Sequence, residues 1–292
     1  MIRIEIGRGH YLLYLLLPHR IKSRLLTPAS RAKLARINRA FNETIYSGAG
    51  ASDYDQIHRY AEDEQHEYPA RPLVAQVWAE GGYGRALEVG AGSGYFTTLI
   101  ARRARSVIAL EPVADMQEVL KARCRAEGVD NVEVLGISAA DLPAALPAAS
   151  VDTAFVIQSL HHLHDRDRVF EALGRVVRPG GRLLMVEPHH NLRRAARLVR
   201  KYLAEYRARA WWSNERNWAT HDFLTRGELR ALCRIGGFAP PRLSGYWIPY
   251  SRRLIRDPDR RFHLEGRVGR WPVFRHWAAV LALEARRGSG GG

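Results

Sequence analysis

The chain has 292 residues, 46% of them hydrophobic, which suits one large globular domain or one domain with added elements. Its only cysteines, Cys124 and Cys233, match no metal-binding spacing, so we expect no metal site and a reduced, cytosolic compartment. No stretch approaches the ~20 apolar residues that span a bilayer. The best candidate, residues 11–17, is too short for a signal peptide and predicts either a buried N-terminal helix or an interfacial anchor.

The net charge of +15 is concentrated at the two ends of the chain. Residues 1–85 carry +3, residues 86–190 carry −2 and residues 191–292 carry +14. Basic ends attract anionic partners such as nucleic acid, anionic lipid or phosphorylated substrates. An arginine-rich surface that is merely solvated explains the same charge, so charge alone leaves the partner open.

Helical patterns dominate residues 1–80. Apolar residues recur at helical intervals in residues 32–40 among basic residues, which predicts an amphipathic helix with a basic face. The small residues at 47–52 predict a linker. Residues 54–67 have helical spacing, and Pro72 is expected to open a helix that continues to Trp78.

From residue 86, short apolar strands alternate with helices. We expect strands at residues 86–89, 106–110, 132–135, 152–157 and 182–187. Helices are expected at residues 95–104, at 116–126, and from a cap at Asp165 to residue 177, followed by a tight turn at 179–181. This alternation predicts an α/β fold with a doubly wound, mainly parallel sheet covered on both faces.

Residues 190–236 break that rhythm. A long arginine-rich helix is predicted at 192–210, followed by Trp211, Trp212 and Trp218, and together they suggest a lid. Thr225 and Glu228 form a capping-box pattern that opens a helix ending near residue 236. Residues 241–248 and 277–283 are expected to be a sixth and a seventh strand.

A glycine loop separates the first strand from the first helix of this alternation. Gly90, Gly92 and Gly94 stand at alternate positions, where glycine permits positive φ and close approach of a ligand. The dinucleotide fingerprint G-x-G-x-x-G would need a glycine where Tyr95 stands. Glu88, just before the loop, would repel a pyrophosphate and attract a cationic ligand.

The loop text LEVGAGSGYFT resembles the first motif of the class I S-adenosylmethionine-dependent methyltransferases. Later segments are similar to that family at the expected distances: Glu111 at the end of the second strand, SAADLP at 138–143, QSLHHL at 158–163 and RVVRPGGRLLMVEP at 175–188. The resemblance covers residues 70–190 well and residues 220–284 in layout. It implies a seven-stranded Rossmann-like methyltransferase fold of the small-molecule or lipid type.

The resemblance also implies S-adenosyl-L-methionine as cofactor. Glu88 would face its ammonium group, and Glu111 would accept both ribose hydroxyls. Ser138 would receive the adenine amino group, where the family often has Asp, and Met116 either packs on the adenine or is an ordinary core residue. The expected cofactor contacts are Glu88, Gly90, Ala91, Gly92, Gly94, Glu111, Pro112, Met116, Ser138, Ala139, Gln158 and Ser159.

The sequence offers several residues that could remove a proton from the methyl acceptor. Histidine is the usual candidate because it titrates near neutrality. His161 and His162 follow the fourth strand and are the first choice as catalytic residues, while His189 and His190 follow the fifth. Many family members act by positioning alone, so this alternative stays open.

The acceptor class is narrowed by two absences in the sequence. No [DN]-P-P-[YF] segment follows the fourth strand, and neither cysteine stands where a cytosine-carbon enzyme needs its nucleophile. We therefore expect O-, C- or N-methylation of a small, hydrophobic or lipid-like acceptor. The alternatives are an RNA methyltransferase that uses the basic flanks, although nucleic acid is disfavoured, and a non-catalytic, membrane-associated protein that only binds the cofactor.

The same observations divide the chain into five expected parts. They are a helical N-terminal extension (1–70), an S-adenosylmethionine-binding core (71–190), a helical lid insert (191–236), C-terminal strands completing the sheet (237–284) and a disordered tail (285–292). We expect the protein in the cytoplasm, with peripheral contact between its basic flanks and the anionic inner membrane face as an open alternative. The sequence does not specify an oligomeric state.

Overall fold

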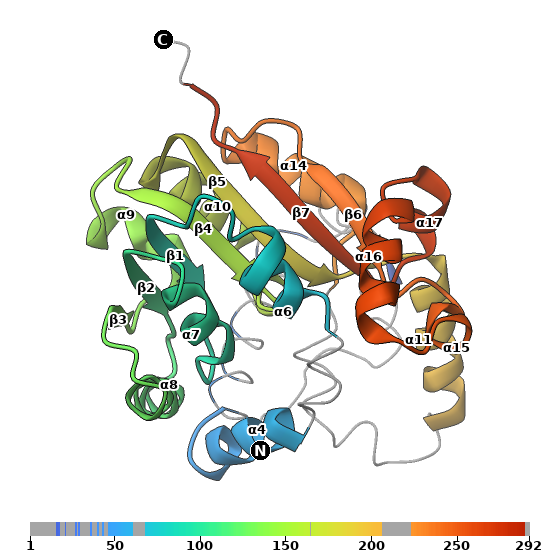
Figure 1. Cartoon of the computed structure of the whole chain (residues 1–292), viewed down its shortest axis with the longest axis horizontal. Helices are drawn as coiled ribbons and strands as arrows, with labels where there is room; N and C mark the ends of the chain where they lie inside the picture. Colours follow the sequence, from blue (N-terminus) through green and yellow to red (C-terminus); the bar gives the residue numbers. More distant parts are fainter. Residues whose placement is uncertain are drawn as a thin grey trace.

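The computed structural model describes residues 46–60, 68–163, 165–205 and 223–289, and isolated positions before residue 46. Seven strands form one sheet in the order β3-β2-β1-β4-β5-β7-β6 (Figure 1). Strands β1 to β5 run parallel, whereas β7 is antiparallel to both β5 and β6. The strands are β1 (Arg85–Val89), β2 (Ser106–Leu110), β3 (Val132–Leu135), β4 (Val151–Ile157), β5 (Val177–Pro188), β6 (Arg242–Tyr246) and β7 (Val280–Arg286).

Successive residues of each strand enter two different cores, because side chains alternate across a sheet. One core contains Leu87, Val156 and Leu183, and is covered by α9 (Leu142–Ala145), α10 (Arg166–Val176) and α14 (Arg226–Ile235). The opposite core contains Ala86, Phe155 and Leu184. Its cover comes from α6 (Ala70–Pro72), the π-helical turn η1 (Leu73–Val77) and α7 (Tyr95–Ala101), with α8 (Ala114–Ala126) beside them.

Both faces of the sheet are therefore buried, as the uninterrupted apolar strands predict. The doubly wound, mainly parallel seven-stranded fold is confirmed. The capping box that opens α14 is also present: Thr225 Oγ1 accepts from the Glu228 N–H at 3.3 Å, and the Glu228 carboxylate accepts from the Thr225 N–H at 2.5 Å.

Several expected boundaries differ from the structure. Helix α4 (Ala49–Tyr60) begins inside the segment expected to be a linker, because small residues such as alanine also form helices. The turn expected at 179–181 lies within β5 as a bulge, with Gly180 at φ +75°. The tail expected from residue 285 begins too early: β7 continues to Arg286, and Arg287 donates to the carbonyl oxygen of Gly174 at 2.7 Å.

The remaining division into parts stays a prediction. Helix α14 falls within the expected lid insert, yet Leu229 and Cys233 on it pack into the core against α10. Helix α11 (Leu192–Glu205) begins where the arginine-rich helix was expected. Trp211, Trp212, Trp218 and the end of that helix lie outside the described residues. Within the described parts, no helix is long and apolar enough to cross a membrane.

Candidate functional site

The glycine loop lies at the carboxyl end of β1, between β2 and β4. Gly90, Gly92 and Gly94 all have positive φ, at +71°, +55° and +82°. A Cβ on Gly90 would stand 2.6 Å from Ser159 Cβ, and one on Gly94 would stand 2.9 Å from Leu120 Cγ. Gly92 differs, since a Cβ there would meet only the tips of Met116 and Tyr54, at 3.7 and 4.0 Å. The outer glycines thus fit the loop to its neighbours, and Gly92 leaves room above it.

Two buried carboxylates flank the loop. Glu88 accepts a hydrogen bond from Thr97 Oγ1 at 2.6 Å, and burial raises its pKa to about 8. Glu111 accepts from the backbone N–H groups of Gly92 and Val113 at 2.9 and 3.0 Å, and burial raises its pKa as well. The described part of the chain forms no salt bridge to either carboxylate.

The other expected cofactor residues surround this loop unevenly. Ala91 and Met116 are buried beside it, and Ala139 is buried at the end of the β3 connection. Ser138 caps the short helix η2 (Ala139–Asp141), with its Oγ accepting from the Ala140 N–H at 3.4 Å. Pro112 is exposed at the surface. Their assignment to the cofactor stays a prediction.

A cover over the loop comes from the N-terminal part of the chain and has no counterpart in the sequence reasoning. Tyr46 packs edge-on against Tyr54 of α4 at 5.2 Å. These rings and Ala51 lie against Val113 and Met116, and the Gly48 N–H donates to Asp115 at 2.6 Å. Isolated tyrosines in a helix give no sequence signal of such a role.

One histidine and one glutamate form a pair at the carboxyl ends of β4 and β5. His161, on the short helix η3 (Leu160–His162), lies with Nδ1 2.8 Å from Glu187 Oε2. The other oxygen of Glu187 accepts from the N–H groups of Ser159 and Leu160, each at 2.8 Å. Both side chains are buried, and burial raises the pKa of Glu187 to about 7.

This pair adjoins the glycine loop directly. Ser159, two residues before His161, donates its hydroxyl to the Val89 carbonyl at 2.6 Å and stands against Gly90. Gln158 has a left-handed backbone with φ +52°, which few non-glycine residues adopt and which is frequent at functional sites. Glu187 was not singled out from sequence; its place at the end of the fifth strand, level with the histidines, was the available signal.

The other histidines have different surroundings. His162 is partly exposed and lies edge-on to Tyr46, with ring centroids 6.0 Å apart. His189 is buried, its Nδ1 lies 3.0 Å from the Ala278 carbonyl oxygen, and burial lowers its pKa to about 4. His190 Nε2 lies 3.1 Å from the Leu16 carbonyl oxygen. His161 is the histidine whose Nδ1 lies 2.8 Å from the Glu187 carboxylate, and the charge of His162 also acts to lower the pKa of Glu187.

Tyr68 is a second feature that the sequence reasoning missed. Its hydroxyl is buried near the Gln158 side chain and the Glu187 carboxylate, and burial raises its pKa, so it stays protonated. Within the described residues it has no hydrogen-bond partner at normal distance. A buried hydroxyl beside Gln158 and the His161–Glu187 pair is suited to donate to a bound molecule.

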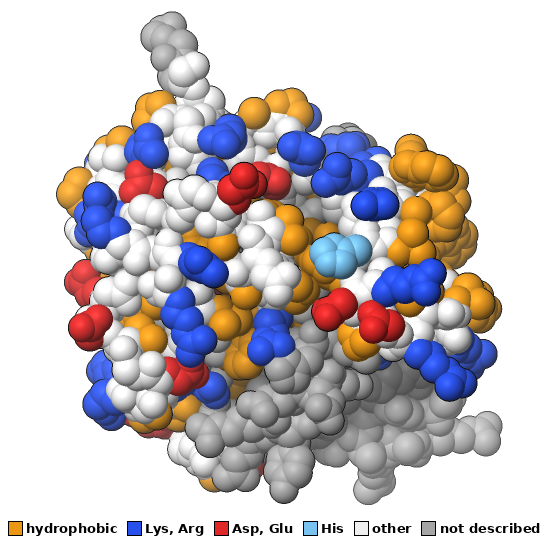
Figure 2. Space-filling model, in the orientation of Figure 1, with side chains coloured by type: hydrophobic (Ala, Val, Ile, Leu, Met, Phe, Trp, Pro, Cys, Tyr) orange, Lys and Arg blue, Asp and Glu red, His pale blue; other side chains and the backbone are white. Residues whose placement is uncertain are grey.

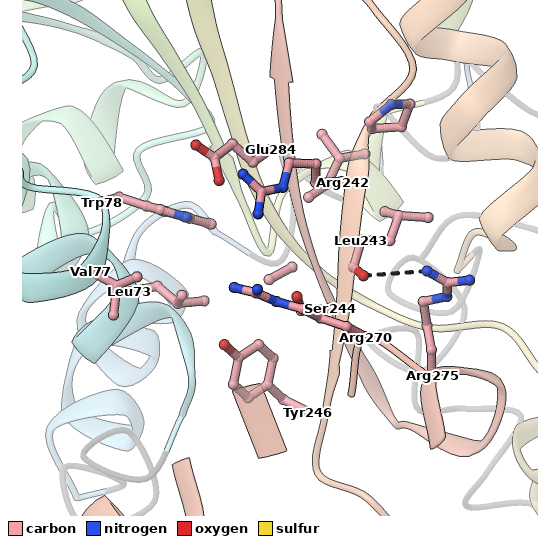
Figure 3. A pocket seen from close by; sticks show the side chains of 13 residues that line it. Leu73, Val77, Trp78, Arg242, Leu243, Ser244, Tyr246, Arg270, Arg275 and Glu284 are labelled. Atoms are coloured by element: carbon pink, nitrogen blue, oxygen red, sulfur yellow. Dashed lines mark hydrogen bonds between the residues drawn. The ribbon is translucent and has the colours of Figure 1, made fainter. Parts of the chain in front are cut away.

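A separate cavity of about 280 Å³ lies on the sheet face between η1 and the β6–β7 pair. It shares no lining residue with the glycine loop or with the His161–Glu187 pair. Figure 3 shows the guanidinium groups of Arg242 and Arg270 directed into it, toward Trp78. Arg275 lies at its edge and donates to the Leu243 carbonyl at 3.5 Å.

The sequence of the chain is similar to those of known methyltransferases. Residues 87–185 match the family model described as a methyltransferase domain. A Mycobacterium tuberculosis protein named probable S-adenosylmethionine-dependent methyltransferase is 40% identical over 179 residues, which are 60% of this chain and 55% of that protein. An uncharacterized methyltransferase of the same species is 38% identical over 102 residues, 35% of this chain and 39% of that protein.

The fold agrees with these sequence matches. A crystal structure of an S-adenosylmethionine-dependent methyltransferase from Thermotoga maritima superimposes with a TM-score of 0.54 at 19% identity, over 81% of this chain and 97% of that one. Residues 87–185 thus match a methyltransferase domain, and the fold is that of solved S-adenosylmethionine-dependent methyltransferases. The chain spans about half or less of the length of the two mycobacterial relatives.

The residues present fit the cofactor of that class. S-adenosylmethionine carries an ammonium group, a sulfonium and two ribose hydroxyls. Glu88 and Glu111 are buried carboxylates that lack a cationic partner in the described residues, and at Gly92 an added Cβ would meet only the side-chain tips of Met116 and Tyr54. A cation and hydroxyl donors would supply what these carboxylates lack, whereas a pyrophosphate would be repelled.

Proposed function

We propose that the protein transfers the methyl group of S-adenosylmethionine to an oxygen of a hydrophobic small molecule, with His161 as general base. The observation that carries this proposal is the buried His161–Glu187 pair beside the glycine loop, with 2.8 Å between Nδ1 and Oε2. Amine acceptors present a lone pair once neutral. A hydroxyl must lose its proton as it attacks, so a fixed base favours an oxygen acceptor.

Each residue has a defined part in this proposal. The Glu187 carboxylate accepts the Nδ1–H of His161, which leaves Nε2 as the atom that takes the acceptor proton. Glu187 is itself held by the two backbone N–H groups of Ser159 and Leu160, and it stabilises the imidazolium as it forms. Glu187 is therefore a positioning residue, and Tyr68 would donate a hydrogen bond to the acceptor oxygen.

The cofactor supplies an activated methyl group, so the protein must orient the acceptor and exclude water. Tyr46, Tyr54 and Ala51 cover the loop from the N-terminal side and contribute to that exclusion. The tyrosine and tryptophan rings around the site, including Tyr68 edge-on to Trp247 at 5.3 Å, favour a hydrophobic acceptor.

The test is transfer of labelled methyl from the cofactor to a cell extract, followed by partition between organic solvent and water. We expect label in the organic phase, and a loss of roughly 10²–10⁴-fold in rate for His161→Asn, the range for removal of a general base. Glu187→Gln should reduce the rate less. His162→Asn serves as the matched control and should transfer label near the parental rate. Equal rates for His161→Asn and the parent, with unchanged cofactor affinity, would contradict the base role.

A further inference from the structure

Helix α17 (Pro272–Trp277) covers the edge strand β6 but turns large apolar side chains outward. None of its residues is buried. Trp271 just before it is 63% exposed, and within it Val273 is 66%, Phe274 36% and Trp277 41% exposed. A helix that only shields a sheet edge needs polar residues on its outer face. Contiguous exposed apolar residues of this size mark an interaction surface.

Helix α11 adds a second exposed apolar stripe. Leu192, Val199 and Leu203 are exposed at positions i, i+7 and i+11, so they share one side of the helix. The two helices meet at their ends, because the Asn191 side-chain amide donates to the carbonyl oxygens of His276 and Ala278 at 3.0 and 2.8 Å. Figure 1 shows α11, α15 (Ser251–Leu254), α16 (Pro258–Val268) and α17 on the same side of the molecule, opposite β3.

The charge around this apolar surface is strongly positive. Residues 250–277 contain eight arginines, of which Arg261 is buried, against three acidic residues, of which Glu265 is buried. Figure 2 shows apolar side chains gathered over α17, with Lys and Arg side chains beside them. Arginine next to exposed tryptophan is typical of segments that lie in the headgroup region of a bilayer.

The separate cavity described above adjoins the same helix. Arg275 belongs to α17, and Arg270 directly precedes Trp271. Arg242 and Arg270 point into a space of about 280 Å³ that is also lined by the ring of Trp78 and by Glu284, whose carboxylate lies beside the Arg242 guanidinium (Figure 3). Guanidinium groups bind phosphate oxygens well, so this cavity suits the headgroup of an anionic phospholipid.

We propose that α11 and α17, with the arginine-lined cavity beside them, dock the protein on the surface of an anionic phospholipid bilayer. The apolar side chains enter the headgroup region, and the arginines bind the lipid phosphates. The surface is linked to the active edge of the sheet, since Asn191 follows β5 and Ala278 precedes β7. One part of this inference rests on the proposed function: docking on the bilayer would bring a hydrophobic acceptor from the membrane to the site.

The experiment is co-sedimentation of the full chain with vesicles of phosphatidylcholine alone or mixed with phosphatidylglycerol. We expect binding to the mixed vesicles that weakens with added salt, and little binding to phosphatidylcholine alone. The double variant Trp271→Ser, Trp277→Ser should lose roughly tenfold or more of its binding. Arg242→Gln with Arg270→Gln should lose the preference for the anionic lipid.

Ile235→Ser is the matched control, because Ile235 is 42% exposed, close to the 41% of Trp277, but ends α14 on another part of the surface. It should bind vesicles like the parent. Cofactor binding is measured for every variant without vesicles, so failure of docking with normal cofactor binding overturns this inference alone. The inference is also overturned if the tryptophan variant binds like the parent, or if that variant instead dissociates a dimer of the parent.

Discussion

The two carboxylates beside the glycine loop are buried close to each other, and this proximity affects the pKa of Glu88. Glu88 and Glu111 are both buried, and their repulsion adds to the burial that raises the pKa of Glu88 to about 8. A single hydroxyl, Thr97 Oγ1, partly offsets this cost for Glu88. The free protein therefore keeps Glu88 protonated near neutral pH, at the place where we expect the cofactor's ammonium group.

Cofactor binding should therefore be linked to proton release at Glu88. A cation beside the carboxylate favours its charged form, so binding near pH 7 should expel a proton and affinity should rise from pH 6 to pH 8. Calorimetry in buffers with different ionisation heats measures this release. Glu88→Gln should remove the Glu88 share of the release, which separates it from titration of the cofactor itself.

The stability of the free protein should change with pH in the opposite sense. The folded state keeps the Glu88 proton to about pH 8, whereas the unfolded chain loses it near the ordinary value of 4.5. Folding therefore loses stability at this residue as pH rises between those values, and Glu88→Gln should flatten that loss. Identical pH profiles of unfolding for the parent and Glu88→Gln would contradict the raised pKa.

Gly92 and Gly90 should respond differently to the same substitution. Gly92→Arg places its side chain between the tips of Met116 and Tyr54, where its Cβ clashes with neither, and should reduce cofactor affinity by about 100-fold or more while the chain still folds, at ~1 kcal/mol for the positive φ. Gly90→Arg collides with Ser159 and should destabilise the fold. Gly128→Arg is the matched control, since Gly128 has φ +65° and no atom within 4 Å of its Cβ position. Normal cofactor binding by Gly92→Arg would remove this glycine from the site.

Helices α10 and α14 approach each other more closely than side chains allow. A Cβ on Gly174 of α10 would lie 2.1 Å from the carbonyl oxygen of Gly236, at the end of α14. The contact places Leu229 and Cys233 in the core beneath both helices. It also places the loop before α14 next to the carboxyl end of β5. In that loop, the Leu224 carbonyl oxygen accepts a hydrogen bond from the His190 N–H.

Gly174→Ala should therefore cost ~1–3 kcal/mol of stability, because α14 must move away from α10. Thermal or denaturant unfolding measures the change. Gly227→Ala in α14 is the matched control: its Cβ would meet only Thr225 Oγ1 at 3.9 Å, and it should stabilise the helix by up to ~1 kcal/mol. Equal stability of the two variants would show that the helices can separate without cost.

The C-terminal strands belong to the same sheet as the central part of the chain. Strand β7 pairs with β5 along its whole length and with β6 on its other side, so residues 242–286 complete the sheet that the methyltransferase domain begins. The N-terminal segment closes over the opposite end of the site through α4 and α8. Cofactor binding should thus stabilise the chain as one unit.

Added S-adenosylmethionine, or the product S-adenosylhomocysteine, should raise the unfolding temperature. At 100 times the dissociation constant, ligand binding adds about 2.7 kcal/mol. For a chain of this size this corresponds to a rise of about 4 °C. Differential scanning fluorimetry measures it, and Gly92→Arg should show no rise. A parent protein whose unfolding temperature ignores both ligands would contradict the cofactor assignment.

The sequence by itself determined the strand–helix alternation, the glycine loop and the class of cofactor. These features are local: apolar runs, glycines and one carboxylate at fixed spacing along the chain. It left open the choice between His161 and His162, and it passed over Glu187, Tyr68 and the tyrosines of the N-terminal cover. Only the tertiary structure pairs His161 with Glu187 and brings Tyr68 near them, because β4 lies beside β5 and residues far apart in the chain meet at the carboxyl edge of one sheet. The exposure of the apolar residues of α17 could not be predicted from sequence for the same reason, since it depends on which surfaces the rest of the chain covers.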